Sequence, residues 1–367
     1  MISKVYILRF TRTKKDIISS VKLLLKAAQA DKAVEKGDIV AVKVHMGERG
    51  NFRHPRPQIV RAVVDFIKSQ GGKPFVTDTT TLYHGYRGNA IDYLETAAIN
   101  GFTYATLGCP IIIADGLHGR DFREVEVGGP LGKVAVASAI AEADAMFVIS
   151  HVKLHISFGF GGALKNLAMG CTARKSKFAM HSPGKPEIDV NKCVGCGICK
   201  KHCRWNAIEI VKGKAKINYE KCVGCGDCLT YCPQGAVKIS WDRTERIQRL
   251  AAWAALGVLK TFKEGKVFYI NLVMEVTSLC DCATIIESPI IPDLGILASY
   301  DPVAIDQASM DLVNEAPGII YSKDGFKIVE SGYDKVKIFH PERRWQAILE
   351  EAERIGLGTR KYKLIEL

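Results

Sequence analysis

The chain has 367 residues, a formal net charge of +12 and a hydrophobic content of 47%, so it is long enough for two or three globular domains. No apolar run approaches the roughly 18 residues of a membrane-spanning helix, and the residues after Met1 lack the apolar block of a signal peptide. These features exclude a membrane protein and predict a cytoplasmic location. The lysines are spread along the chain without interleaved aromatic residues, which favours a lysine-rich surface over a nucleic-acid site.

Strand and helix patterns alternate along much of the chain. In chain order they predict strand 1–10 at an edge or start of the sheet, strand 39–44, helix 58–68, strand 74–78, helix 136–144, strand 145–150 and, after a cysteine-rich stretch, helices 244–260 and 301–314. Apolar residues at helical spacing carry the helix assignments, and short buried runs carry the strands. This alternation predicts an α/β fold with a mixed or mostly parallel sheet covered by helices.

Polar side chains follow three of the predicted strands. Two strands end at His45 and Asp78, and a third leads into a dense run of histidine and lysine before a glycine-rich turn. Ligands bind beyond the carboxyl ends of parallel strands, and the N–H groups of a helix start suit an anion, so we expect one shared pocket. The candidate catalytic residues are His45, Asp78, His151, Lys153, His155 and Lys165. The alternative is a turn with solvated basic residues.

Eight of the twelve cysteines form two copies of the spacing C-x2-C-x2-C-x3-C. This spacing is typical of bacterial ferredoxins, in which the fourth cysteine of each run ligates the other [4Fe–4S] cluster. The predicted ligands are Cys193, Cys196, Cys199 and Cys232 for cluster 1, and Cys222, Cys225, Cys228 and Cys203 for cluster 2. Zinc knuckles are the alternative, but zinc sites usually pair C-x-x-C dyads and do not repeat this rhythm.

The two cysteine runs lie in an internal repeat, in which 188–210 aligns with 217–239. Each half predicts a strand, a cluster loop, a helical turn and a strand. The predicted domains are a discontinuous α/β domain, 1–183 and 241–367, and an inserted ferredoxin-like 2[4Fe–4S] domain, 184–240. The repeat is asymmetric at Arg204, which replaces the expected proline and predicts unequal cluster potentials.

Two of the remaining cysteines form a C-x-C motif, Cys280-Asp-Cys282. With Cys171 and His181 this pair would complete a tetrahedral set of soft ligands for an additional metal. The alternative is a set of reduced, buried thiols that pack like small hydrophobic side chains.

These motifs resemble the DUF362 family, in the subgroup that carries a ferredoxin insert. The resemblance rests on Lys43-Val-His-Met-Gly, Val152-Lys-Leu-His155, Gly162-Ala-Leu-Lys-Asn166, Met169-Gly-Cys171, Cys280-Asp-Cys282 and Asp301-Pro-Val-Ala-Ile-Asp306. It implies an α/β core with two [4Fe–4S] clusters and adds weight to a third site at Cys171, His181, Cys280 and Cys282. It implies no reaction, because the family's function is unknown.

Three functions fit these patterns. The first is an iron–sulfur oxidoreductase, in which electrons pass through the clusters to a small-molecule substrate or metal at the pocket. The second is a non-catalytic electron carrier whose α/β body docks a redox partner protein. The third is a nucleic-acid-binding protein with structural clusters, and it lacks any recognised binding motif. Side chains of catalytic type outside the cysteine-rich stretch favour the first function.

Overall fold

The computed structural model describes residues 2–10, 16–83, 85–181, 185–203, 205–222, 227–238, 245–282, 286–322 and 325–367. The predicted cluster ligand Cys225 and the asymmetric position Arg204 lie outside these residues. The predicted domain boundaries, at 183/184 and 240/241, also lie outside them. Of the helices that are described, none combines the length and the hydropathy that a membrane span requires.

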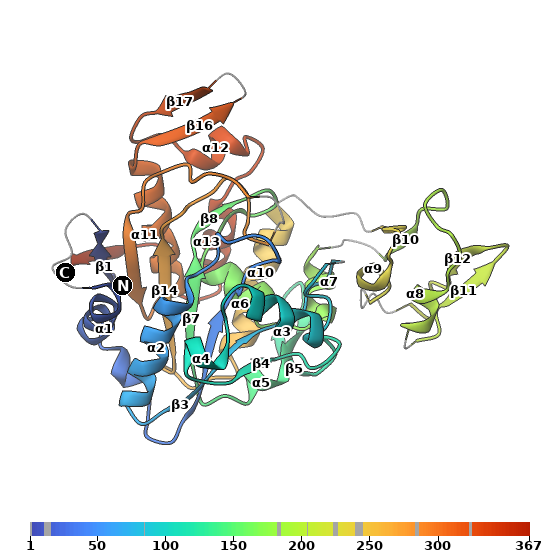
Figure 1. The fold of residues 1–367 in the computed structure, drawn as a ribbon, viewed down its shortest axis with the longest axis horizontal. Helices are drawn as coiled ribbons and strands as arrows, with labels where there is room; N and C mark the ends of the chain where they lie inside the picture. Colours follow the sequence, from blue (N-terminus) through green and yellow to red (C-terminus); the bar gives the residue numbers. More distant parts are fainter. Residues whose placement is uncertain are drawn as a thin grey trace.

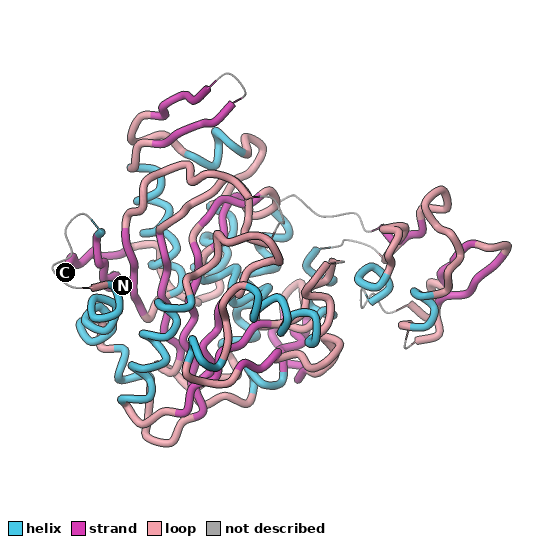
Figure 2. The backbone as a smooth tube through the Cα atoms, viewed as in Figure 1, coloured by secondary structure: helices cyan, strands magenta, loops and turns pink. Residues whose placement is uncertain are grey.

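The described residues form a large mixed sheet of eight strands (Figures 1 and 2). Across the sheet the order is β18 (Tyr362–Glu366), β1 (Ser3–Arg9), β15 (Gly295–Ser299), β14 (Val267–Val273), β7 (Ala145–His151), β2 (Ile39–Val44), β3 (Lys73–Asp78) and β4 (Ile111–Ile113). The strands from β14 to β4 are mutually parallel, and β15 is antiparallel to both neighbours. The two ends of the chain pair as β1 and β18.

Both faces of this sheet are covered, which explains why its central strands are apolar throughout. In β2 the side chains of Val40, Val42 and Val44 pack on one face and that of Ala41 on the other, as the two-residue period of a strand requires. The first face carries α1 (Ile17–Ala27), α2 (Pro57–Ser69), α3 (Ala90–Ile99) and α4 (Tyr104–Leu107). The second carries α6 (Ala163–Gly170), α10 (Glu245–Leu259), α11 (Pro302–Glu315) and α13 (Gln346–Arg354).

Smaller elements surround this core. They are η2 (Ala30–Ala33), the hairpins β5 (Phe122–Gly128) with β6 (Gly132–Ala137), β8 (Lys153–His155) with β9 (Gly159–Gly161), and β16 (Gly318–Ser322) with β17 (Gly325–Val329), and the helices α5 (Ser138–Ala141), α7 (Arg174–His181) and α12 (Lys335–Phe339). The hairpins were not predicted.

The α/β fold class is confirmed, with one local correction. The helix predicted over 136–144 is wrong: β6 continues to Ala137 and only the short α5 follows. The β-branched Val134 and Val136 pair with β5 and are fully buried, so tertiary packing overrides the helix propensity of the alanines. The N-terminal strand, predicted as an edge or first strand, is the first strand in the chain and lies inside the sheet, because β18 pairs with it.

The chain changes direction between β2 and β7. From β2 it crosses one face through α2 to β3, whereas from β7 it returns to β14 through α6 and α10 on the other face. The connections that follow the adjacent carboxyl ends of β2 and β7 therefore diverge, which leaves a crevice between them. In open α/β sheets this switch point is where ligands bind.

The described residues between 185 and 238, which we call the cysteine-rich unit, form a separate small core (Figure 1). Its elements are β10 (Glu187–Ile188), α8 (Ile198–Lys201), β11 (Ile208–Val211), β12 (Lys214–Ile217), α9 (Asp227–Tyr231) and β13 (Val237–Lys238). β10 pairs with β13 and β11 with β12. Within the described residues, the predicted succession of strand, loop, helical turn and strand occurs in both halves of the repeat.

Candidate functional site

A cavity of about 340 Å³ opens at the carboxyl ends of β2, β3 and β7. All six side chains predicted to share a pocket line it: His45, Asp78, His151, Lys153, His155 and Lys165. Cys280, Cys282 and His181 line it as well. Its volume lies at the lower end of the range for small-molecule sites. His45, Asp78 and His151 meet because β2, β3 and β7 are parallel neighbours that end at one edge of the sheet, and the β8 hairpin and helix α6 bring the other three.

The carboxylate of Asp306 binds the start of helix α6, which carries Lys165. The carboxylate of Asp306 accepts hydrogen bonds from Ala163 N at 2.6 Å and Leu164 N at 2.9 Å. A Cβ atom on Gly162 would collide with this carboxylate, so the glycine permits the contact. The anion expected at this helix start is thus an internal side chain, and the N–H groups are occupied.

A buried ion pair forms one wall of the cavity. Lys43 Nζ lies 2.9 Å from Asp78 Oδ1 and donates to Asn166 Oδ1 at 2.6 Å. The Tyr93 hydroxyl donates to the other oxygen of Asp78. Burial alone would raise the pKa of Asp78, but Lys43 and His45 lower it below its ordinary value. The carboxylate is therefore charged and held in place, which suits a structural role for Asp78.

Asp281, between the two cysteines of the C-x-C motif, is the centre of the charge network. Its fully buried carboxylate lies 3.0 Å from Lys153 Nζ, 3.3 Å from His151 Nδ1 and 3.6 Å from His45 Nδ1. Burial would raise the pKa of Asp281, but Lys153, His45 and His151 together lower it well below its ordinary value. No sequence pattern marked this residue as part of a site. Its position between two metal-ligand candidates was the available signal.

A second network, also missed, joins His45 to the loop after β3. Arg87 Nε lies 3.0 Å from Glu48 Oε2, and Arg87 Nη1 is 2.8 Å from His45 Nε2. Arg87 also donates to the Tyr83 hydroxyl, which itself donates to the carbonyl of Cys282 at 3.2 Å. Burial lowers the pKa of His45 to about 3, so its imidazole is neutral. No sequence motif marks Arg87.

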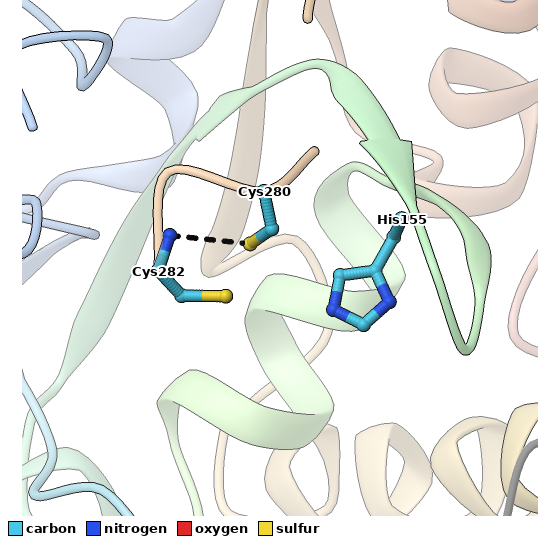
Figure 3. A group of neighbouring side chains, drawn as sticks. All are labelled: His155, Cys280 and Cys282. Atoms are coloured by element: carbon cyan, nitrogen blue, oxygen red, sulfur yellow. Dashed lines mark hydrogen bonds between the residues drawn. The ribbon is translucent and has the colours of Figure 1, made fainter. Parts of the chain in front are cut away.

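His155, Cys280 and Cys282 lie together at the cavity wall, with their nitrogen and sulfur atoms within 4.8 Å of one another (Figure 3). Cys282 N donates to Cys280 Sγ at 3.4 Å, and Lys165 Nζ lies 3.6 Å from the same sulfur. A hydrogen bond from the side chain of Cys282, assisted by Lys165 and His155, lowers the pKa of Cys280 well below its ordinary value. Burial lowers the pKa of His155 to about 4. This geometry is compatible with metal binding and with thiol chemistry.

The other two members of the predicted third site do not join this group. Cys171 Sγ donates to Asn166 O at 3.8 Å, and burial raises the pKa of Cys171 to about 12. That environment is typical of a packed, inert thiol. His181 lines the cavity, with its ring 6.3 Å from that of Phe158. Among the described residues, the group of possible metal ligands therefore consists of His155, Cys280 and Cys282.

A second, smaller cavity of about 20 Å³ lies in the cysteine-rich unit. The cysteines that line it are Cys193, Cys196, Cys199 and Cys232. They come from both halves of the repeat and are the set predicted for cluster 1. Backbone N–H groups point at two of the sulfurs, from Ala215 to Cys193 at 3.3 Å and from Ala236 to Cys232 at 3.2 Å.

The same N–H···S contact recurs in the other half of the repeat. Ala207 N donates to Cys203 Sγ at 3.3 Å, in the position equivalent to Ala236 and Cys232. Burial, followed by the nearby thiols, raises the pKa of Cys199. A thiol surrounded by other thiols and by N–H donors fits a thiolate-ligated metal cluster, which removes the protons and satisfies the donors.

The cysteine-rich unit contacts the α/β body close to the large cavity. Leu229, adjacent to Cys228, packs against Leu82 and Phe178, and Leu82 lines the cavity. Three polar contacts accompany it: Tyr231 hydroxyl with His118 Nδ1 at 2.8 Å, the Arg174 guanidinium 5.4 Å from the centre of the Tyr231 ring, and Arg120 Nη2 donating to His202 O at 2.9 Å.

Two solved structures are distantly similar to this chain. The lactate racemase apoprotein from Thermoanaerobacterium thermosaccharolyticum is 14% identical with a TM-score of 0.36, and the match covers 74% of this chain and 51% of that one. A Thermotoga maritima protein is 10% identical with a TM-score of 0.38, over 82% of this chain and 59% of that one. The chain thus spans little more than half of either protein. No curated protein matches the sequence.

The sequence also matches a family profile. The match covers residues 40–311 and is described as a domain of unknown function, DUF362. It spans the strands β2, β3 and β7, the helix α6 and the C-x-C motif, so the elements that build the large cavity lie within it. The chain therefore belongs to the DUF362 family.

Proposed function

We propose that this chain is an iron–sulfur protein with two [4Fe–4S] clusters and that electrons pass through them to a redox reaction in the large cavity. The observation that carries the proposal is the small cavity in the cysteine-rich unit. Three cysteines of the first repeat and one of the second line it. This exchange of the fourth ligand is a feature of two-cluster ferredoxins, and a pair of zinc knuckles would not need it.

Cluster 1 would be held by Cys193, Cys196, Cys199 and Cys232, and cluster 2 by Cys203, Cys222, Cys225 and Cys228. Such clusters accept and release one electron each. Thiolates are the ligands that iron–sulfur clusters prefer, and the N–H groups of Ala215, Ala236 and Ala207 would stabilise them. In this proposal 184–240 is an inserted domain, and 1–183 with 241–367 is the α/β domain.

The two ends of the cysteine-rich unit differ in a way that supports a direction of electron flow. At the cluster 1 end, Cys196 is exposed and Val194 is 62% exposed. At the other end, Leu229 contacts Leu82, which lines the large cavity. A redox partner protein would therefore deliver electrons at cluster 1, and cluster 2 would pass them towards the cavity.

A non-catalytic electron carrier is the second candidate. The exposed Val190, Val194 and Trp205 of the cysteine-rich unit would suit a docking surface for a partner, as either function requires. A carrier, however, has no need for the buried charges around Asp281, which are costly to desolvate. This network favours the redox enzyme.

Anaerobic iron and sulfide analysis tests the cluster assignment. We expect about eight iron and eight sulfide per chain, with two reversible one-electron signals in EPR-monitored titration. A zinc-containing, EPR-silent protein would contradict the proposal.

Variants of the large cavity test where the electrons go. Lys165→Ala and His155→Ala should keep both EPR signals and full reduction of a generic one-electron acceptor protein, but lose turnover of any substrate that oxidises the reduced clusters. A matched control is Lys175→Ala, which removes an exposed lysine paired with Glu124. If both cavity variants retain substrate turnover, the chain acts as a carrier.

A further inference from the structure

We propose that Cys280 and Cys282 form a redox-active pair, which cycles between dithiol and disulfide and reduces a small-molecule disulfide in the large cavity. The inference rests on the proposed function, because the clusters supply the electrons. It also competes directly with a metal at the same three side chains. The hydrogen bonds of His155 decide between the two.

The imidazole of His155 is oriented for donation to sulfur. Ser157 N and Phe158 N donate to His155 Nδ1 at 3.0 and 3.2 Å, so Nδ1 is an acceptor and the neutral ring carries its proton on Nε2. Figure 3 shows the other ring nitrogen turned towards the two sulfurs. A metal-binding histidine needs the reverse arrangement, with a free lone pair towards the metal and a proton on the far nitrogen.

The sulfur of Cys280 is surrounded mainly by donors. Besides the His155 ring, Cys282 N lies at 3.4 Å and Lys165 Nζ at 3.6 Å. One acceptor opposes them, Asp281 Oδ1 at 3.4 Å, but this oxygen is bound to Lys153 Nζ at 3.0 Å. Donors stabilise a thiolate. Cys280 is therefore the nucleophile and Cys282 the second thiol, while Lys165 and His155 are positioning residues.

The reaction balances in two stages. The Cys280 thiolate attacks one sulfur of the substrate disulfide, and the first substrate thiolate leaves and takes a proton. Cys282 loses its proton and attacks the Cys280 sulfur, which releases the second substrate thiol and leaves a Cys280–Cys282 disulfide. Two electrons and one proton then restore the thiolate and the thiol. Each cluster supplies one electron, and an external low-potential one-electron donor protein reduces the clusters again.

A short stretch of chain joins the source of these electrons to the pair. Leu229 of the cysteine-rich unit packs on Leu82. The next residue, Tyr83, donates its hydroxyl hydrogen bond to the carbonyl of Cys282 at 3.2 Å. The contacts therefore run from the cluster 2 end of the unit to Cys282.

Alkylation followed by mass spectrometry tests the pair in the cluster-loaded protein. The tryptic peptide 267–323 contains no cysteine besides Cys280 and Cys282. After anaerobic treatment with oxidised glutathione, the peptide should resist iodoacetamide at both positions. Photochemical reduction of the clusters should restore two alkylation sites, and Cys282→Ser should instead trap a mixed disulfide at Cys280.

The outcomes separate this inference from the proposed function. If a phosphine restores both thiols but reduced clusters do not, the pair exists and electron transfer to the cavity fails. If the clusters transfer electrons but the mass of peptide 267–323 never falls by that of two hydrogens, no disulfide forms and the proposed pair is overturned. A metal site would replace the pair if metal analysis finds one equivalent of a metal besides the cluster iron in the native protein. Both Cys280→Ser and Cys282→Ser would then have to lack that metal.

The role of Lys165 has its own readout. Lys165→Met should slow iodoacetamide modification of Cys280 at pH 6.5 by at least tenfold and have much less effect at pH 9, because the lysine stabilises the thiolate. Lys175→Met is the matched control and should leave both rates unchanged. Equal rates in wild type and Lys165→Met would contradict the assignment of the thiolate.

Discussion

The cysteines of this protein occur in two contrasting surroundings. In the described part of the cysteine-rich unit, four cysteines line one small cavity beside a small apolar core, and backbone N–H groups contact the sulfurs of two of them. At the large cavity, Cys280 and Cys282 face Lys165, a histidine and a buried carboxylate. The first arrangement suits ligands that share a metal cluster, and the second suits a reactive thiolate. The residue type is the same, so the neighbours determine the chemistry.

The largest difference between the two regions should appear in iron content. Cys193→Ser removes a ligand of cluster 1, and we expect iron to fall from about eight to about four per chain. Cys280→Ser should leave about eight, because this thiol is no cluster ligand. Cys109→Ala, at a buried thiol of the α/β body, is the control. Iron loss in Cys280→Ser would remove the contrast between the two sets.

The charge network of the cavity should dominate the stability of that region. Asp281→Asn leaves Lys153 as a buried ammonium without its partner, which should cost about 3–5 kcal/mol. The matched change Glu124→Gln breaks the exposed pair with Lys175 and should cost less than about 1 kcal/mol. Thermal unfolding followed by circular dichroism measures both. Similar midpoints for the two variants would show that the network is solvated.

Lys177 should give the cavity region a pH dependence. Burial lowers the pKa of Lys177 to about 8 from 10.5. The unfolded chain therefore binds more protons between these values, and the stability contribution of this lysine rises as pH increases from about 8 to about 10.5.

Against Lys177→Met, the wild type should gain up to about 3 kcal/mol over that interval, measured by thermal unfolding at several pH values. Lys175→Met, at an exposed position two residues earlier, is the control. A constant difference between wild type and Lys177→Met would refute the shift.

The smallest expected effect concerns the contact between the two regions. Leu229→Ala removes side-chain atoms that pack on Leu82 and Phe178, so electrons should reach the Cys280–Cys282 pair a few-fold more slowly. Iron content should not change. Val190→Ala, at an exposed position of the same unit, is the control. The rate at which alkylatable thiols reappear after flash reduction measures the difference, and equal rates would indicate another route.

The sequence predicted the strands β1, β2, β3 and β7 and the convergence of the cavity side chains, because buried strands have clear apolar runs and neighbouring parallel strands have common ends. It could not reveal Arg87 or the ion pairs of Asp281, since these depend on loops that fold back over the strand ends. The helix predicted at 136–144 failed for a related reason: Val134 and Val136 are held in β6 by pairing with β5. Alanine content alone could not reveal that pairing.

The segment that carries Leu82 and Tyr83 contacts both the cysteine-rich unit and the Cys282 carbonyl. If a ligand in the cavity alters this segment, thermodynamic linkage makes the effect between the two regions reciprocal. A ligand that shifts Tyr83 and binds more tightly when cluster 2 is reduced must raise the midpoint potential of that cluster by the same free energy. Occupancy of the cavity would thereby favour entry of electrons into cluster 2. With the cavity empty, the lower potential would keep the cluster oxidised and so limit idle reduction of water or oxygen.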